Sequence, residues 1–562
     1  MDRRTVLAFV LIGLIIILTP YYFKWLSGDR LPPPQDQWEG PDETRRTAPP
    51  ASQAPPSITR PPAREKPSPP SDQAPPETSA HPTPADFTPE QVLVETDRYV
   101  ATFTTRGGRL TSLKLRDYRH QNGDWLELIR PGSAGLGLSL DTGSLDEFEF
   151  EPNRSDLSLH GPQQGELVFR ARPNGVWVEK RFRFQGNRYR IDMELAVSGA
   201  QQGAKLGVGW SGGLADTEAN PQEDIVYAMA VTRVGGEVET WDAPDLGPEV
   251  TPPSGRLSWV GLRNKYFLAA LIPPEGRYDL NLQGVEVGQV EHYTVEVIAD
   301  ADRGPFEFGV YVGPISYDLL RSQNRDLSGR HRELELDEFM DYGPFLRSIF
   351  KPITILILKA FLTLHQIIPN YGLVIIVFSI LIKIVLFPLT HKSLEAAARM
   401  QQLQPKLAAL KEKYPDDQQK VGQETMKLYK EEGVNPLGGC LPMIPQMPIL
   451  FSLFNVFRGA IELRQSEFAL WIDDLSQPDR LSIGGIEIHV LPLLMAVSTF
   501  LQSKMTMKDP KQAVMVYIMP VFMTFIFWSF SSGLVLYWTM FNILTVIQQQ
   551  VMEKAKAVLS RT

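Results

Sequence analysis

The sequence contains a single cysteine, Cys440, among its 562 residues. One cysteine cannot form an intramolecular disulfide, a cysteine-based zinc site or a CxxC redox motif. Because no cysteine stands directly after the first apolar run, the sequence does not show the attachment point of an N-terminal lipoprotein. Acidic side chains outnumber basic ones by 65 to 56. Binding of DNA or RNA phosphates needs clustered lysine and arginine, so this balance argues against direct nucleic-acid binding.

The motifs that would indicate an enzyme are also missing. The chain has no phosphate-binding glycine loop, and its apolar segments contain no paired aspartates, no serine with histidine and no HExxH. His120, His160 and His292 are scattered without the spacing of metal ligands. We therefore expect a protein that is not an enzyme, with no catalytic residues, no cofactor, no metal and no use of ATP.

The first long apolar run is Val6 to Phe23, behind Arg3 and Arg4. About 18 residues at ~1.5 Å each span ~27 Å, enough to cross the hydrocarbon of a bilayer. A cleaved signal peptide would need small residues after this run, whereas bulky aromatic residues follow it up to Trp25. The pattern predicts an uncleaved anchor with its N-terminus in the cytoplasm.

The other long apolar runs all follow Gly343. They are Tyr371 to Leu389, Leu437 to Ala460, His489 to Met505 and Ala513 to Val551. The last would measure roughly 57 Å as one helix, which is too long for a ~30 Å hydrocarbon layer. Ser531 to Gly533 offer a turn, so we expect a helical hairpin there and five crossings in all after the anchor.

A different pattern occupies Phe345 to Pro369. Polar residues recur at helical spacing along one face, and apolar residues fill the others; the polar residues are Lys359, Thr363, Gln366 and Asn370. This pattern is typical of an amphipathic helix that lies in the membrane interface.

Basic residues set the orientation of the crossings. The segments 391–433, 504–511 and 554–561 are rich in lysine, whereas the loop 462–487 is mostly acidic. Because lysine-bearing loops stay in the cytoplasm, both termini are predicted to be cytoplasmic.

Two regions with no apolar span are predicted to lie outside the cytoplasm. Residues 31–89 are rich in proline, alanine and serine and cannot bury a core, so they predict a disordered tether. From Gln91 to about Leu336 the pattern has period two; an example is the run Val176, Val178, Lys180, Phe182 and Phe184. This alternation predicts an antiparallel all-β sandwich that serves as a binding or spacer domain.

The basic segment His391 to Gly433 predicts two antiparallel helices. Met400, Leu403, Leu407 and Leu410 share one helical face, and Tyr414 to Asp417 interrupt the helix. The segment is either a solvated loop that follows the charge rule or a docking surface for a partner.

Among the ionisable residues of the predicted membrane helices, Lys383 is the one strong case for a function. Burying a charge there costs roughly 2.5–3.5 kcal/mol, which makes it a functional candidate. Either its side chain reaches the cytoplasmic interface, or it lines a hydrated cavity open to the cytoplasm. Polar stripes on the other helices favour the cavity, which we predict to be a substrate groove. Its predicted residues are Lys383, Ser379, Thr390, Gln446, Ser498, Gln502, Trp538, Asn542 and Thr545.

Methionines recur at i, i+4 spacing on two apolar helices. Unbranched methionine surfaces adapt to many shapes, although ordinary core packing gives the same pattern. We predict a client-contact wall made of Met443, Met447, Met515, Met519 and Met523.

Several long motifs resemble the YidC/Oxa family of membrane-protein insertases. They are NPLGGC at 435–440, QMPI at 446–449, LRQSEFALWIDDLS at 463–476 and SGLVLYW at 532–538, with FPLT, LQPK and IQQQ as shorter matches. The matching core spans about Phe345 to Met552, and the anchor, tether and large sandwich resemble the Gram-negative bacterial form. The family groove carries a positive residue, usually arginine, where this chain has Lys383.

The resemblance implies a multi-domain membrane protein with an N-terminal anchor, a periplasmic all-β supersandwich and a five-helix insertase core with a cytoplasmic helical hairpin. The expected parts are an anchor at 1–26, a linker at 27–90, the β domain at 91–336, an interfacial helix at 343–369, membrane helices at 371–390, 437–460, 489–505, 513–531 and 533–551, the hairpin at 391–433, a periplasmic loop at 461–488 and a tail at 552–562.

The resemblance also implies the function. We expect a membrane protein insertase and chaperone of the bacterial inner membrane that works both with and without the Sec translocase. The implied partners are nascent membrane proteins, SecD and SecF, the ribosome through the cytoplasmic loops and tail, and the lipid bilayer. A transporter or channel is the alternative, but the sequence shows no internal repeat and no polar path to the periplasmic side.

Overall fold

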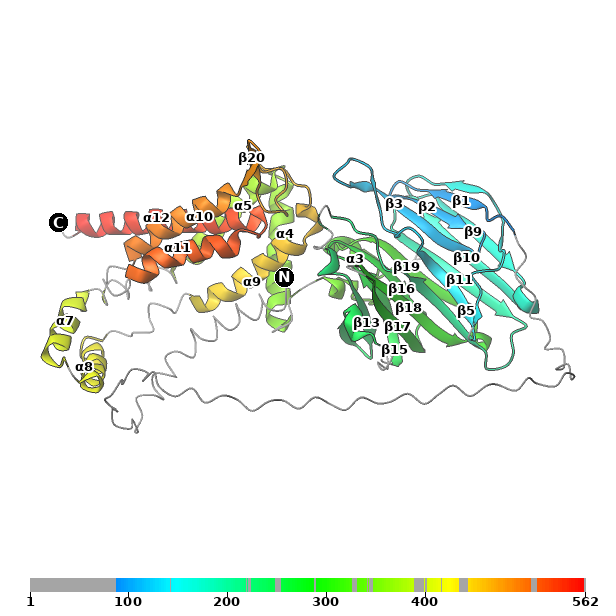
Figure 1. Cartoon of the computed structure of the whole chain (residues 1–562), viewed down its shortest axis with the longest axis horizontal. Helices are drawn as coiled ribbons and strands as arrows, with labels where there is room; N and C mark the ends of the chain where they lie inside the picture. The colour runs from blue at the N-terminus through cyan, green and yellow to red at the C-terminus, as the bar shows by residue number, and fades with distance from the viewer. Residues whose placement is uncertain are drawn as a thin grey trace, which may run out of the picture. The chain divides into compact units, whose positions relative to one another are not determined.

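The computed structural model describes residues 87–559 with short gaps. The gaps are 142, 219, 221–223, 248–253, 288–289, 326–330, 341, 343–346, 389–398, 400–401, 416, 434–442 and 507–512. The predicted anchor at 1–26 and most of the predicted linker at 27–90 lie outside the described residues. The described residues form a β-rich region and a helical region that succeeds it along the chain (Figure 1).

Nineteen strands form the β-rich region within the described residues. One layer has the order β8 (Asp156–Ser158), β1 (Gln91–Glu95), β2 (Tyr99–Thr104), β3 (Arg109–Arg119), β5 (Ala134–Leu140), β12 (Lys205–Ser211), β18 (Val290–Asp300) and β17 (Arg277–Val287), with β4 (Trp125–Glu127) beside β3 and β6 (Gly143–Ser144) beside β5. All of these pairs are antiparallel except β1 with β8, so the layer is the kind of sheet that the alternation predicted.

The second layer is antiparallel throughout. Its order is β7 (Glu151–Pro152), β9 (Gln164–Ala171), β10 (Trp177–Gln185), β11 (Arg190–Ser198), β19 (Phe306–Pro314), β16 (Phe267–Ile272), β15 (Gly255–Arg263), β13 (Met229–Val234) and β14 (Glu237–Trp241). A short pairing of β15 with β17 joins the two layers.

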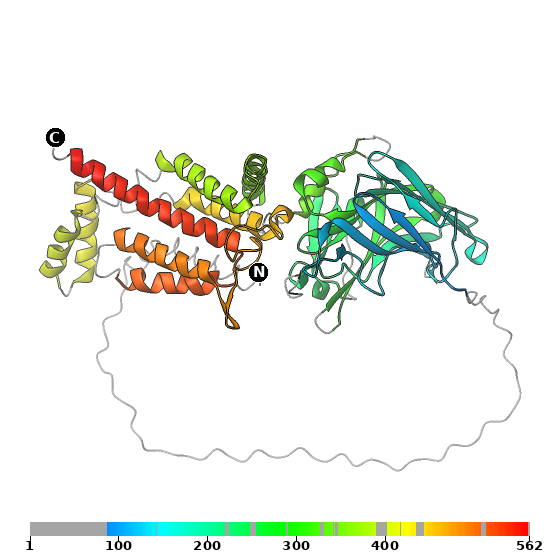
Figure 2. The same cartoon turned by 90° about the horizontal axis from the view of Figure 1, so that it is seen from above.

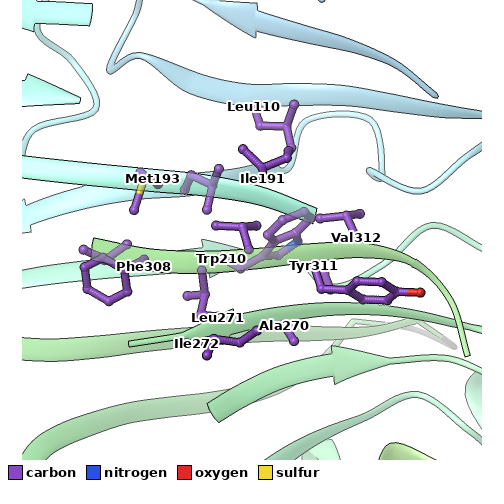
Figure 3. Close-up of a cluster of buried hydrophobic side chains, with 14 of the residues drawn as sticks. Leu110, Ile191, Met193, Trp210, Ala270, Leu271, Ile272, Phe308, Tyr311 and Val312 are labelled. Atoms are coloured by element: carbon purple, nitrogen blue, oxygen red, sulfur yellow. The ribbon is translucent and has the colours of Figure 1, made fainter. Parts of the chain in front are cut away.

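The two layers face each other across one hydrophobic core. The ring centroid of Phe103 on β2 lies 4.9 Å from that of Phe182 on β10, in the other layer. Figure 3 shows Trp210 of β12 among residues of the second layer, including Ile191, Leu271 and Phe308. The prediction of an antiparallel β-rich domain is therefore confirmed.

Alternation explains why these strands form. Along β10 the buried positions are Val178, Lys180, Phe182 and Phe184, and the residues between them are more exposed. This is the predicted period-two face. A period of two places Lys180 inside the sandwich together with the apolar residues.

The helical region contains eight helices of ten or more residues among the described residues. They are α4 (Arg347–His365), α5 (Tyr371–Val385), α7 (Gln404–Lys413), α8 (Gln418–Glu431), α9 (Met443–Gly459), α10 (Val490–Thr506), α11 (Ala513–Phe527) and α12 (Ser532–Leu559). Helix α12 packs against α5 and α10, α10 packs against α11, and α4 packs against α5 and α9 (Figures 1 and 2). Phe361, Phe378 and Phe457 meet in the core of this bundle, with ring centroids 4.8 and 5.6 Å apart.

The helix bounds refine several expectations. Helix α4 ends at His365, so Gln366 and Asn370 of the predicted polar stripe lie beyond it, and Asn370 instead caps α5 by accepting from the Leu373 backbone N–H. Within the described residues, Ser348–His365 of α4 is the one helical segment long and apolar enough to cross a membrane. Its interfacial position stays a prediction. Helix α12 continues through Leu559, into the predicted tail.

Helices α7 and α8 lie within the segment where a hairpin was predicted. Leu403 and Leu407 are buried, and the Asp417 carboxylate accepts from the Lys420 N–H at the start of α8. Lys406 pairs with Glu432 across the two helices. A receptor role for this pair stays a prediction.

The β-rich region and the helical region contact each other directly. Arg464, after α9, donates to Glu218 at 2.7 Å and to the carbonyl of Thr217 at 3.0 Å, and both charged side chains are almost fully buried. Burial raises the pKa of Glu218, although Arg464 opposes that shift. Tyr317 of α3 (Tyr317–Ser322) packs into the core of the helical bundle.

Candidate functional site

Lys383 lies near the C-terminal end of α5, facing α12. Its Nζ donates to Thr545 Oγ1 at 2.7 Å and lies 4.0 Å from the ring centroid of Phe541. The residue is only 8% exposed. A lysine ammonium has three donors, and among the described residues this one has a single hydroxyl acceptor and an aromatic face.

A second polar contact joins α12 to α10, three residues before Thr545. The Asn542 amide donates to Ser498 Oγ at 3.2 Å and to Thr499 Oγ1 at 2.8 Å. Asn542 and Ser498 are buried. Residues three apart on a helix share a face, so Asn542 and Thr545 form one polar strip on α12. We refer to Lys383, Thr545, Asn542, Ser498 and Thr499 together as the polar layer.

The hydroxyls of the polar layer also bond to their own helices. Thr545 donates to the Phe541 carbonyl at 2.7 Å, and both Ser498 and Thr499 donate to the Met495 carbonyl at 2.8 Å. With their protons engaged in this way, the oxygens are free to accept from Lys383 and Asn542. The layer therefore orients acceptors on α10 and α12 and leaves a cation on α5.

The predicted groove residues divide into two groups. Four of them form two contacting pairs, Lys383 with Thr545 and Asn542 with Ser498. Ser379 is buried and donates to the Ile375 carbonyl of its own helix at 2.7 Å. Gln502 lies half-buried one turn after Ser498, and Gln446 is half-buried near the start of α9. Trp538 packs against Phe527, with ring centroids 5.6 Å apart, and Thr390 lies outside the described residues.

Sequence reasoning missed two members of the site. Thr499 receives the shorter of the two Asn542 hydrogen bonds, and Phe541 presents its ring to Lys383. Thr499 directly follows Ser498 and falls off the polar stripe that Ser498 shares with Gln502. Phe541 lies four residues before Thr545, a spacing that could have identified it.

The predicted methionine wall is partly described. Met447, Met519 and Met523 are half-buried, and Met523 packs against the core of the bundle. The side chains of Met443 and Met515 lie outside the described residues. Helix α11 exposes a broad apolar face beside these methionines; its residues include Tyr517, Ile518, Val521, Phe522 and Phe525. A face of this kind suits contact with lipid or with an apolar segment.

The loop between α9 and α10 holds the N-terminal ends of three helices. The Asn370 amide donates to the Phe468 carbonyl at 3.1 Å, which fixes the start of α5. Asp479 accepts from the Leu491 N–H at 2.9 Å and from Trp471 Nε1 at 3.1 Å, which fixes the start of α10.

The same loop fixes the start of α12. Ser532 N–H donates to the Gln477 carbonyl at 2.7 Å, and Gly533 N–H donates to the Leu475 carbonyl at 2.9 Å. Burial raises the pKa of Asp474, whose carboxylate accepts from Ser476 and from the Gln465 N–H. We refer to residues 464–479 as the capping loop. The helices that carry the polar layer are thus gathered at one end by a single segment.

The site can bind and orient acceptors but contains no pair suited to bond cleavage. The polar layer offers an ammonium, an amide and hydroxyls, without a carboxylate or imidazole to act as a base. Among the described residues, no group of three or more histidine, cysteine, aspartate or glutamate residues could hold a metal ion. The chemistry that this geometry supports is non-covalent attraction of negative or hydrogen-bonding groups.

Two family models match the chain over complementary ranges. The model described as "60Kd inner membrane protein" matches residues 363–558, and the model described as "YidC periplasmic domain" matches residues 91–356. The first range holds the polar layer, and the second holds the β-rich region.

Full-length relatives agree with these models. A protein named "Membrane protein insertase YidC" from Chlorobium luteolum is 36% identical over 500 residues, covering 83% of each chain. Another of that name from Syntrophus aciditrophicus is 33% identical over 582 residues, covering 99% of this chain and 100% of its own. A crystal structure titled "Active YidC insertase crystal structure with the first transmembrane domain resolved" matches at 19% identity with a TM-score of 0.35, covering 84% of this chain and 95% of its own.

Proposed function

The chain belongs to the YidC/Oxa family of membrane protein insertases, and we propose that its polar layer is the part of the insertase that receives the hydrophilic end of a client protein. The observation that carries this proposal is the position of Lys383: among the described residues, this buried cation has one hydroxyl acceptor, on α12, and donors to spare. A charge in such a place is costly and is retained where it serves a function. The client's polar tail or loop would enter beside Lys383 from the cytoplasm, while its apolar segment moves toward lipid.

Lys383 would act by attraction. An acidic residue in the client's tail completes the hydrogen bonding that Thr545 satisfies only in part. Outward transfer of one negative charge across the membrane then gains about 2.3 kcal/mol per 100 mV with the interior negative. This gain, together with burial of the client's apolar segment at about 25 cal/mol per Å², supplies the driving force without ATP.

The exposed apolar face of α11 would guide the client's apolar segment. Val521 and Phe525 are 71% and 81% exposed, and they lie on the same helix as Met519 and Met523. Flexible methionines beside an exposed apolar face suit segments of different shape. We propose that clients slide along this face into the bilayer.

The membrane topology and the Sec-related partners belong to the same proposal. The family supports an inner-membrane protein with a periplasmic β-rich domain. The proposal adds that both termini are cytoplasmic and that five crossings follow the anchor. It also adds that SecD and SecF dock on the periplasmic domain and that the ribosome contacts α7, α8 and the C-terminal tail. Lysine-rich segments at the predicted cytoplasmic positions support the orientation.

The decisive experiment varies Lys383 and the client together. Lys383→Arg keeps the charge and should retain insertion of an acidic-tailed client. Lys383→Glu should reduce that insertion by about tenfold, which corresponds to ~1.4 kcal/mol of lost attraction. Lys383→Met should give an intermediate loss, and a matched neutral-tailed client should respond least. The measurement is insertion into proteoliposomes at equal amounts of folded variant.

Lys359→Met is the matched control. Lys359 also lies on an apolar helix near an aromatic ring, 5.2 Å from the centroid of Tyr317, but it is exposed. The Lys359→Met variant should insert both clients as well as wild type does. Equal insertion of the acidic-tailed client by wild type, Lys383→Met and Lys383→Glu would refute the proposal and leave Lys383 as an interfacial anchor.

A further inference from the structure

A recess separate from the polar layer lies where α4 and the last turn of α9 meet the β-rich region. It is open to solvent, and eleven residues line it. Two of them are arginines, Arg263 and Arg458, and none is acidic. The walls are otherwise mostly apolar, with Met340 and Leu358 among them. The recess therefore combines positive charge with an apolar surface.

Arg458 is the unusual member of this recess. Its guanidinium lies 4.3 Å from the ring centroid of Tyr227 and 5.7 Å from that of Phe454. Among the described residues, the structure gives it neither a carboxylate partner nor a hydrogen-bond acceptor. A guanidinium carries five N–H donors, and leaving a half-buried one without an acceptor is costly. Stacking on Tyr227 holds the group in place but satisfies none of those donors.

Thr354 supplies a second, independent observation. This residue of α4 is 3% exposed, and its hydroxyl is buried without a hydrogen-bond partner in the described part of the chain. A buried hydroxyl without a partner calls for an explanation, since such groups are normally bonded. Thr354 and Arg458 line the same recess, so a single ligand with several acceptor oxygens would accept from both.

The neighbouring charges make the recess selective for anions. The Arg263 side chain donates to the carbonyls of Asn264 and Phe339, and the lining itself contains no acidic residue. The nearby lysine of α4, Lys351, is already paired with Asp337 and Glu338. Asp337 and Glu338 are thus engaged with Lys351, and neither is paired with Arg458.

The position of the recess indicates what kind of anion it takes. Helix α4 contains the segment long and apolar enough to cross a membrane, and it exposes Ile349 and Leu356. Phosphate oxygens suit the forked donors of arginine, and acyl chains suit apolar helix surfaces. From this geometry we propose that the recess binds the phosphate of a membrane phospholipid, with Arg458 and Thr354 as its donors and the acyl chains lying along α4 and α9. This inference is independent of the polar layer and of Lys383.

Native mass spectrometry of the full chain in detergent, with dioleoyl phosphatidylglycerol as the probe, tests the proposal. Wild type should retain a bound lipid. Arg458→Gln should reduce retention at least fivefold, Arg458→Lys should retain part of it because it keeps charge but not the fork, and Thr354→Val should reduce it about twofold. The matched control is Arg303→Gln, at an exposed arginine paired with Asp300 in the β-rich region, which should change nothing.

Two further probes separate the sources of binding. Dioleoylglycerol has the same chains without the phosphate and should bind much more weakly; equal retention would overturn the proposal by showing apolar binding alone. Inorganic phosphate bound in an Arg458-dependent way, with no retained lipid, would assign the recess to a soluble anion and equally overturn it.

A measurement on the unmodified protein guards against variants that fail to fold. Phosphatidylglycerol with a photoreactive acyl chain should crosslink to peptides of α4 and α9 in wild-type protein in nanodiscs. Crosslinks spread over the other helices, with none on these two, would contradict the assignment.

Discussion

The two regions of this molecule each bury a lysine, and they do so in different ways. In the β-rich region, Lys180 is fully buried, and its Nζ donates to the carbonyls of Gly107, Gly108 and Leu136 at 2.7–3.0 Å. In the helical region, Lys383 has one hydroxyl acceptor and one aromatic ring. The first ammonium uses all three of its donors, and the second does not.

If Lys383 acts as proposed, this difference separates a structural charge from a functional one. Lys180 reaches from β10 across the core to carbonyls of the facing layer, so it joins the two layers and has no capacity for a ligand. Lys383 joins two helices through one bond and keeps donors for another molecule. Burial alone therefore does not identify a functional cation; the number of unused donors does.

The sharpest test replaces each lysine with methionine. Lys180→Met leaves three buried carbonyls without a donor, and we expect it to lower the free energy of unfolding of the β-rich region by about 3 kcal/mol. Lys383→Met leaves only a hydroxyl that already bonds to its own helix, so the change for the bundle should be near zero or stabilising. Hydrogen exchange of β10 and α12 in the full-length protein measures both. An equal loss of unfolding free energy in both variants would show that the two lysines do not differ in this way.

A second test uses pH. Burial lowers the pKa of Lys180 from 10.5 to about 7. The ammonium that donates to three carbonyls is therefore the folded form below about pH 7. Between pH 7 and 10.5 the unfolded chain binds a proton that the folded domain does not, so stability should rise with pH through this window, by up to about 1.4 kcal/mol per pH unit, and level off below pH 7. The measurement is the stability of wild type relative to Lys180→Met at pH 7 and pH 9. A difference that is constant with pH would show that the three carbonyls keep Lys180 protonated throughout.

The smallest expected effect concerns Thr545. Thr545→Val removes the single hydroxyl acceptor of Lys383 but keeps the shape of the side chain. We expect insertion of an acidic-tailed client to change by two- to fivefold, consistent with about 0.5–1 kcal/mol for one hydrogen bond. The control is Thr539→Val on the same helix, whose hydroxyl donates to the Val535 carbonyl. If both variants behave alike, the Lys383–Thr545 contact has no functional weight.

The sequence predicted the β-rich region well because a period of two is a local signal. The alternating run from Val178 to Phe184 specified which side chains of β10 face the core. It could not specify what Lys180 meets there, because its acceptors come from residues 44 to 73 positions away. Such contacts depend on how the two layers are placed against each other, and the sequence of one strand does not determine that placement.

The polar layer was predictable only in part for the same reason. Lys383 and Asn542 stand out as polar residues in apolar helices, and both lie in the layer. The rotation of α10 against α12 decided that Thr499 would join Ser498, and the sequence of one helix does not fix that rotation. Gln446 and Trp538 matched the polar stripes equally well, yet Trp538 packs on Phe527.

The capping loop has a mechanical consequence. It ties the N-terminal ends of α5, α10 and α12 through main-chain and side-chain bonds, whereas Lys383 and Thr545 connect α5 and α12 farther along by one bond between side chains. Three helices that are held together at one end and joined by few polar contacts at the other can separate at that second end. If clients enter between α5 and α12 as proposed, their admission requires rupture of this one polar contact, while the end held by the capping loop stays closed.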